Sequence, residues 1–107
     1  MKASYLEIGA PDGERARSFF ADLFGWTFNP MEDGGWFDSG DIKSGLHGND
    51  DLPAIIVYFE VPNIEGAVAR VRELGGIADD PTPEEPGFGR FSTCADPQGV
   101  RFGLRQL

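Results

Sequence analysis

In the first half of the chain, apolar and polar side chains alternate and then change to a helical period. Residues 5–8 alternate, which is typical of a half-buried strand, and Pro11 ends this segment. Asp12 is then well placed to cap a helix that continues to Gly25. The apolar positions of this helix form one stripe at spacings of three and four, made of Ala16, Phe19, Phe20, Leu23 and Phe24. Three short strands are predicted to follow, at residues 26–30, 35–39 and 42–47.

The same succession of patterns returns in the second half. Residues 54–61 alternate strongly, Pro62 ends the predicted strand, and the string 58–61 matches 5–8 in residue type. Asn63 caps a second helical stripe, made of Ile64, Ala67, Val68, Val71 and Leu74. Further strands are predicted near 77–79, 90–95 and 100–105, the last two joined by a tight turn. The order therefore predicts one α+β domain over residues 1–107, built from two βαβββ modules of roughly 1–50 and 53–107.

Charge and composition exclude several classes of partner. Nine Lys and Arg residues against eighteen Asp and Glu residues give a net charge of −9, which argues against nucleic acid and against an anionic membrane surface. The same charge permits a cationic ligand, or it only keeps the protein in solution; both interpretations stay open. The lone cysteine, Cys94, excludes an intrachain disulfide, suits a cytoplasmic location and is expected to be buried and unreactive. We expect neither a signal peptide nor a membrane-spanning segment.

Three segments together resemble a known superfamily. Residues 18–26 read SFFADLFGW, residues 57–61 read VYFEV before the second helix, and residues 89–104 contain GRF followed by DPQGVRFGL. In this order they resemble the vicinal oxygen chelate superfamily, which includes glyoxalases, bleomycin resistance proteins and extradiol dioxygenases. The resemblance implies paired βαβββ modules whose curved mixed sheets form a cup, within one chain or across a dimer. It also implies that the protein is a homodimer.

The resemblance locates the positions at which metal-dependent members hold their metal, typically with His, Glu or Gln. Carried over residue by residue, these positions fall at Tyr5, Ile56 and Gly103. None of them suits a divalent ion, because Ile and Gly offer no side-chain donor and a neutral Tyr is a poor ligand. We therefore expect no metal site and no other cofactor. A shift of the alignment by one or two residues would instead bring Glu7 or Glu60 into reach.

Alternation along the strands separates the helix-facing side chains from those that face the expected cup. The residues that alternation assigns to the cup, and so to ligand binding, are Tyr5, Glu7, Ile56, Tyr58, Glu60, Arg101 and Arg105. Two further candidates for ligand binding are His47 and Trp36; Trp36 offers a stacking surface, although core or dimer packing explains it equally well. The two glutamates pair either with the two arginines or with a ligand amine, and a desolvated Glu7 or Glu60 is a candidate catalytic base. His47 is either a solvated residue at a loop edge or a group at the pocket rim that titrates near neutral pH.

Three kinds of function are compatible with these observations. The first is metal-independent binding of a small organic ligand, cationic or aromatic, with drug sequestration of the bleomycin-resistance type as its specific form. The second is a lyase, an isomerase or a dioxygenase, as in other members of the superfamily. The third is a non-catalytic interaction subunit, which predicts an exposed apolar patch in place of an enclosed cavity. We favour the first, because the metal positions lack donors and the chain is acidic.

Overall fold

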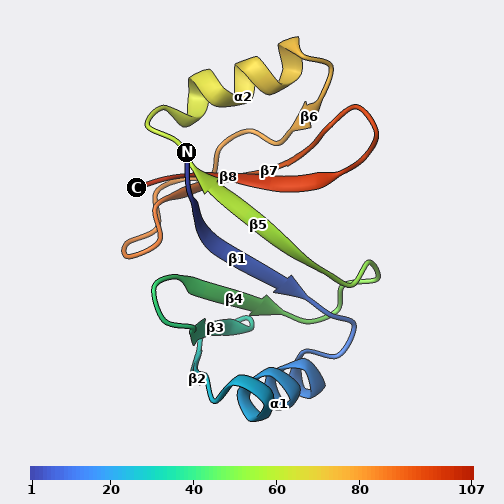
Figure 1. The fold of residues 1–107 in the computed structure, drawn as a ribbon, viewed down its shortest axis with the longest axis vertical. Helices are drawn as coiled ribbons and strands as arrows, with labels where there is room; N and C mark the ends of the chain where they lie inside the picture. Colours follow the sequence, from blue (N-terminus) through green and yellow to red (C-terminus); the bar gives the residue numbers. More distant parts are fainter. The chain divides into compact units, whose positions relative to one another are not determined.

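The computed structural model describes residues 1–107 and has the element order β1–α1–β2–β3–β4–β5–α2–β6–β7–β8 (Figure 1). The order is βαβββ twice, which confirms the predicted α+β fold of two similar modules. The chain divides into two compact units. We call residues Tyr5–Ile56 the N-terminal unit, and Met1–Ser4 together with Val57–Leu107 the C-terminal unit. The closure of the modules into a cup stays a prediction, as does the single-domain interpretation.

The N-terminal unit contains a four-stranded sheet with the order β2-β3-β4-β1. Its elements are β1 (Ala3–Gly9), α1 (Gly13–Phe24), β2 (Thr27–Pro30), β3 (Gly35–Asp38) and β4 (Lys43–His47). The strands β1 and β4 are parallel, whereas β3 is antiparallel to both β2 and β4. Each predicted strand is confirmed to within two residues, because the turn signals between the strands are local and strong.

Helix α1 begins and ends as the sequence predicts. The Asp12 side chain accepts a hydrogen bond from the Arg15 backbone N–H at 3.2 Å, and Gly25 closes the helix in the left-handed region with φ 70°. Ala16, Phe20 and Ala21 pack on the core of buried residues Ile8, Phe37 and Leu46.

The apolar stripe of α1 does not pack against the sheet as a whole. Phe19, Leu23 and Phe24 are 60%, 58% and 53% exposed, and no residue of the helix is fully buried. The helix rests on the sheet along Ala16 and Phe20, so the outer part of the stripe lies beyond the contact. These three side chains form an exposed apolar patch, which we call the α1 patch.

The C-terminal unit has a corresponding sheet with the order β5-β8-β7-β6. Its elements are the end of β5 (Ala54–Glu60), α2 (Ile64–Glu73), β6 (Ile77–Ala78), β7 (Arg90–Ala95) and β8 (Arg101–Gln106). Asn63 caps α2 by accepting the Gly66 N–H at 3.2 Å, as predicted. The turn before β8 is also confirmed, since the Gly99 N–H donates to the Asp96 carbonyl at 3.0 Å. The core of this unit contains Val61, Ile64, Val68, Ala78, Cys94 and Leu104.

Cys94 is 3% exposed, as the sequence predicts. Burial raises the pKa of its thiol above the ordinary value. A neutral buried thiol is a poor nucleophile, so the side chain serves as packing. Neither helix is long and apolar enough to cross a membrane.

Candidate functional site

One face of the N-terminal sheet packs on α1, and the opposite face carries the polar residues that the sequence assigns to ligand binding. In the pairing register, Gly45 of β4 lies opposite Glu7 of β1 and opposite Trp36 of β3. Residues directly opposite one another on paired strands point to the same side of the sheet. Glu7 and Trp36 therefore share the face that points away from α1, whereas Ile8 and Leu46 lie on the helix side in the core.

Four side chains on this face form a continuous network. The Tyr5 hydroxyl donates to Glu7 Oε1 at 3.1 Å, and Glu7 Oε2 lies 2.6 Å from His47 Nδ1. The other ring nitrogen of His47, Nε2, lies 2.9 Å from Asp50 Oδ2. Asp50 Oδ1 in turn accepts the Leu52 backbone N–H at 2.9 Å. We call Tyr5, Glu7, His47 and Asp50 the His47 network.

Two glycines within the strands make room for the His47 network. A Cβ at Gly45 would collide with the Tyr5 hydroxyl and the Glu7 carboxylate, and a Cβ at Gly9 would collide with Asp50 and His47. Glycine inside a strand often marks such a close approach. Asp50 is carried by the loop after β4, and its backbone N–H donates to the Ala10 carbonyl at 3.1 Å. The positions of the polar groups are therefore fixed by both strands and by this loop.

The geometry favours the protonated form of His47. A carboxylate only accepts hydrogen bonds, so both ring nitrogens must carry a proton for both contacts to be hydrogen bonds. Burial lowers the pKa of His47, but the hydrogen bonds and charges of Glu7 and Asp50 outweigh it, so the pKa is raised above 6.5. With 45% of its side chain exposed, the imidazolium remains accessible from outside. His47 is therefore a titratable group whose ring is fixed by Glu7 and Asp50, and it is not freely solvated.

An aromatic surface lies beside the network on the same face. The Lys43 ammonium stands 4.8 Å from the centroid of the Trp36 ring, within the range of a cation–π contact. Trp36 is half-buried, and Ile56, at the limit of the N-terminal unit, is also half-buried. The structure thus brings Tyr5, Glu7, Trp36 and His47 onto one face.

In the C-terminal unit, an aromatic side chain occupies the position that corresponds to Glu7. The Tyr58 hydroxyl lies 3.0 Å from Thr93 Oγ1, and its ring meets Phe91 edge to face at 5.4 Å. The ring also fills the space that a Cβ at Gly103 would need. Because Tyr58 lies opposite a strand glycine as Glu7 does, Glu7 corresponds to Tyr58 and not to Glu60. The match in residue type between 5–8 and 58–61 is therefore shifted by two residues from the structural correspondence of the two strands.

Glu7 and Arg105 have partners other than the glutamate–arginine pairs that the sequence left open. The Glu7 carboxylate contacts Tyr5 and His47 instead. Arg105 is buried, and its guanidinium donates to the Phe88 carbonyl at 2.8 Å and the Ser4 carbonyl at 3.0 Å. Glu60 lies opposite Arg105 in the register, and Arg101 is exposed.

The residues at the family's metal positions do not fit a divalent ion. The Tyr5 hydroxyl is engaged with Glu7, Ile56 has no donor atom, and the Gly103 position is covered by the Tyr58 ring. The side-chain donors of the His47 network are directed at one another. No group of three or more His, Cys, Asp or Glu residues in the chain is arranged to hold a metal ion. The network therefore lacks free convergent donors.

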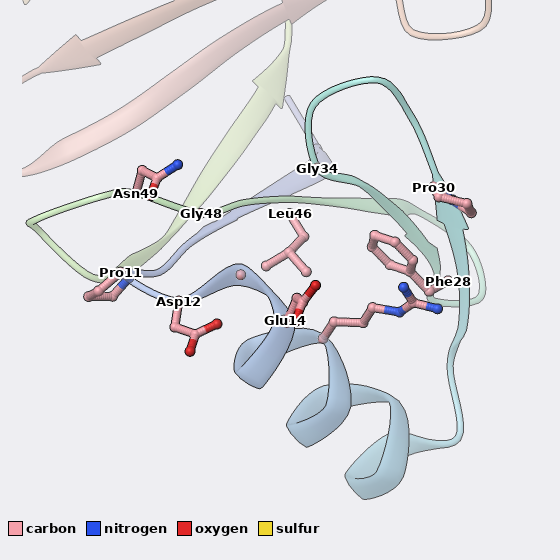
Figure 2. Close-up of a pocket in the computed structure, with 11 residues that line it drawn as sticks. Pro11, Asp12, Glu14, Phe28, Pro30, Gly34, Leu46, Gly48 and Asn49 are labelled. Carbon is pink, nitrogen blue, oxygen red and sulfur yellow. The ribbon is translucent and has the colours of Figure 1, made fainter.

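A separate cavity of about 560 Å³ lies on the helix side of the same unit (Figure 2). Leu46 and Phe28 contribute apolar surface, Asp12 and Glu14 contribute carboxylates, and the Arg17 guanidinium lies 4.5 Å from the centroid of the Phe28 ring. The other lining residues are Pro11, Gly13, Pro30, Gly34, Gly48 and Asn49. The sequence analysis did not predict this cavity, because its lining residues come from separate segments that share no recognisable motif.

Sequence comparison matches the N-terminal part of the chain to a family model. Residues 5–37 match the model described as bleomycin resistance protein-like N-terminal. The anthracycline biosynthesis protein DnrV of Streptomyces peucetius is 30% identical over 94% of this chain and 45% of its own length. The putative glyoxylase CFP32 of Mycobacterium tuberculosis is 27% identical over 96% of this chain and 44% of its own length. The chain thus spans about 45% of the length of the curated relatives it matches.

Solved structures share the fold at low sequence identity. Methylmalonyl-CoA epimerase from Mycobacterium tuberculosis has a TM-score of 0.69 and 15% identity, over 97% of this chain and 86% of that chain. Homoprotocatechuate 2,3-dioxygenase from Arthrobacter globiformis has a TM-score of 0.76 and 20% identity, over 99% of this chain and 36% of that chain. At such identities the similarity shows the fold alone.

Proposed function

Because the chain belongs to the vicinal oxygen chelate superfamily, we propose that it binds a small planar organic molecule without the help of a metal ion. The observation that carries the proposal is the His47 network on the face that points away from α1. Ligand sites combine aromatic surface with a few fixed polar groups, and this face has both. Trp36 offers a half-buried ring, and Glu7, His47 and Asp50 offer polar groups held in place.

The chemistry of the residues present supports the proposal that no metal is needed. The three positions at which a metal would be expected carry an engaged phenol, an aliphatic side chain and a glycine. An ion bound there would need several carboxylate or imidazole donors, which these residues do not supply. The His47 network would have to be taken apart to ligate a metal, at the cost of its own hydrogen bonds.

The relatives suggest which planar molecule to try first. One curated relative is named as an anthracycline biosynthesis protein, and the matching family model is of the bleomycin-resistance type. We propose that this chain sequesters an anthracycline-like aromatic compound, whose ring system would lie against Trp36. The acidic net charge of −9 would favour a ligand that carries an amino group.

Calorimetric titration of the protein with an anthracycline tests the proposal. We expect saturable binding and a loss of about two- to tenfold in affinity for Trp36→Leu, the range that corresponds to one aromatic stacking contact. Glu32→Gln, a change on an exposed residue of the same unit, serves as the control and leaves the affinity unchanged. Absence of binding to anthracyclines, cationic glycopeptides and aromatic amines alike would refute the proposal.

A homodimer is the second part of the proposal, and the α1 patch supports it. Phe19, Leu23 and Phe24 are each more than half exposed on one short helix. The curated relatives have more than half of their length outside the matched region, enough for a second domain of this size. We propose that a second copy of this chain covers the α1 patch.

Light scattering should give the mass of a dimer for the native protein and the mass of a monomer for Leu23→Glu. A monomeric native protein would contradict the proposed dimer.

A further inference from the structure

The two carboxylates of the His47 network share a single imidazolium, and this suggests how a cation would enter the site. Glu7 and Asp50 lie on opposite sides of the His47 ring, one at each nitrogen. We infer that the ligand recognised here is an organic amine whose ammonium group binds by exchange for the His47 proton. The inference rests on the proposed function, since it concerns the same face.

Hydrogen-bond counting shows how the exchange keeps both carboxylates paired. A neutral imidazole donates through one nitrogen only, and its other nitrogen presents a lone pair. When His47 loses its proton, one of the two carboxylates therefore loses its donor and faces this lone pair. An ammonium group supplies up to three N–H donors and one positive charge, so it replaces the lost bond and restores the charge balance between Glu7 and Asp50.

Among the charged groups around this site, His47 is the residue whose charge is expected to change near neutral pH. His47 faces Glu7 of β1, beyond which lies Tyr5, and it also faces Asp50 of the loop after β4. The other charged residues on the adjoining elements are Lys43 on β4, Asp38 on β3, Asp12 before α1 and Asp51 on the loop. Histidine is the side chain whose titration ordinarily falls in the neutral range, so proton exchange with the ligand is assigned to it.

The exchange has a definite dependence on pH. Because the pKa of His47 is raised by its two carboxylate partners, the resident imidazolium competes with an incoming cation in mildly acidic solution. Each bound amine then releases one proton, and the association constant rises by up to about tenfold per pH unit. Above the pKa of His47 the competition ends, and the affinity becomes independent of pH.

Titration calorimetry with a matched pair of probes tests the inference. The probes are 1-naphthylmethylamine and the uncharged 1-naphthalenemethanol, each titrated into the whole chain between pH 5.5 and 8.5. Repeating the titrations in buffers of different ionisation enthalpy counts the protons released. We expect release of about one proton per bound amine at pH 6 and none for the alcohol.

Two variants connect the result to the residues. His47→Gln should still bind the amine but release no proton, and its affinity should not change with pH. Glu7→Gln should weaken the amine by about tenfold and leave the alcohol unaffected, because it removes one charge from the site. Asp22→Asn, on the exposed side of α1, is the control for a general loss of negative charge.

The outcomes separate the inference from the proposed function. Amine binding without proton release, or proton release that persists in His47→Gln, would overturn the inference and leave the binding function standing. If neither probe nor an anthracycline binds at any pH, the proposed function fails, and the inference fails with it.

Discussion

His47 Nδ1 lies 2.6 Å from Glu7 Oε2, a contact between residues 40 positions apart in the sequence. Parallel pairing of β1 with β4 creates it, since Gly9 lies opposite His47 and Glu7 opposite Gly45. The contact depends on the strand register as a whole, and a slip by one residue would place the two groups on opposite faces. Its properties can therefore be tested one residue at a time.

Removing the Glu7 charge should lower the pKa of His47. In Glu7→Gln the imidazolium keeps Asp50 but loses one carboxylate, so we expect the pKa to move down toward its ordinary value. Following the ring proton resonances of His47, the sole histidine, by NMR across a pH titration measures this directly. Glu32→Gln should leave the pKa of His47 where it is, and an unchanged pKa in Glu7→Gln would show that the contact does not form in solution.

Protein stability should fall as the pH rises through the pKa of His47. The folded-state pKa lies above the unfolded value of 6.5, so the stabilisation is fully present below pH 6.5 and is lost above the folded pKa. Because the ring is 45% exposed, we expect a change of no more than about 1 kcal/mol in the free energy of unfolding. Urea unfolding at several pH values measures it, and His47→Gln should remove this part of the pH dependence. A native protein that grows more stable over the same interval would contradict the assignment.

Alanine at Gly103 and alanine at Gly45 should have different effects on stability. At Gly103 the added methyl group meets the ring of Tyr58, which is buried against Phe91, so we expect a loss of about 1–3 kcal/mol. At Gly45 it meets only the far ends of two side chains, the Tyr5 hydroxyl and the Glu7 carboxylate, the second of which is flexible. Gly45→Ala should therefore cost less than about 1 kcal/mol but disturb the His47 network.

Thermal or urea unfolding compares the two variants, and the NMR titration reports on His47. The expected pattern is a destabilised Gly103→Ala with a normal His47, and a nearly stable Gly45→Ala whose His47 has a lowered pKa. The reverse pattern would show that Tyr58 and Glu7 do not occupy these positions.

Cys94 should react with a thiol reagent only after unfolding. Its side chain is 3% exposed, and burial raises the pKa of the thiol, so both access and thiolate content are low. In native buffer a disulfide reagent such as DTNB should modify it much more slowly than in concentrated guanidinium chloride. Rapid stoichiometric reaction of the native protein would argue against the packing of the C-terminal core.

The elements of the fold could be predicted because their signals are local. Asp12 and Asn63 cap the helices, Gly25 ends the first one, and alternation assigns Glu7 to the face away from α1. Such features need only neighbouring residues, and the sequence contains them all. The α1 patch shows the limit: periodicity finds an apolar stripe but not how much of it the sheet covers.

The candidate site could be predicted only in part. Alternation predicts that Tyr5 and Glu7 share one face, yet the pairing of Glu7 with His47 depends on the β1–β4 register. Asp50 is not among the predicted site residues, because its role depends on a loop conformation that brings it back to the His47 ring. Gly9 and Gly45 were the signal in the sequence that could have indicated this network, since glycine within a strand marks a place where neighbouring side chains need the space.

Metal-independent ligand binding is tested most directly by an anthracycline titration before and after exhaustive chelation. Because Tyr5, Ile56 and Gly103 offer no usable ligand set, the dissociation constant should be the same in both samples, with no stoichiometric divalent metal in the purified protein. Loss of binding on chelation, with recovery on adding a transition metal, would contradict this account.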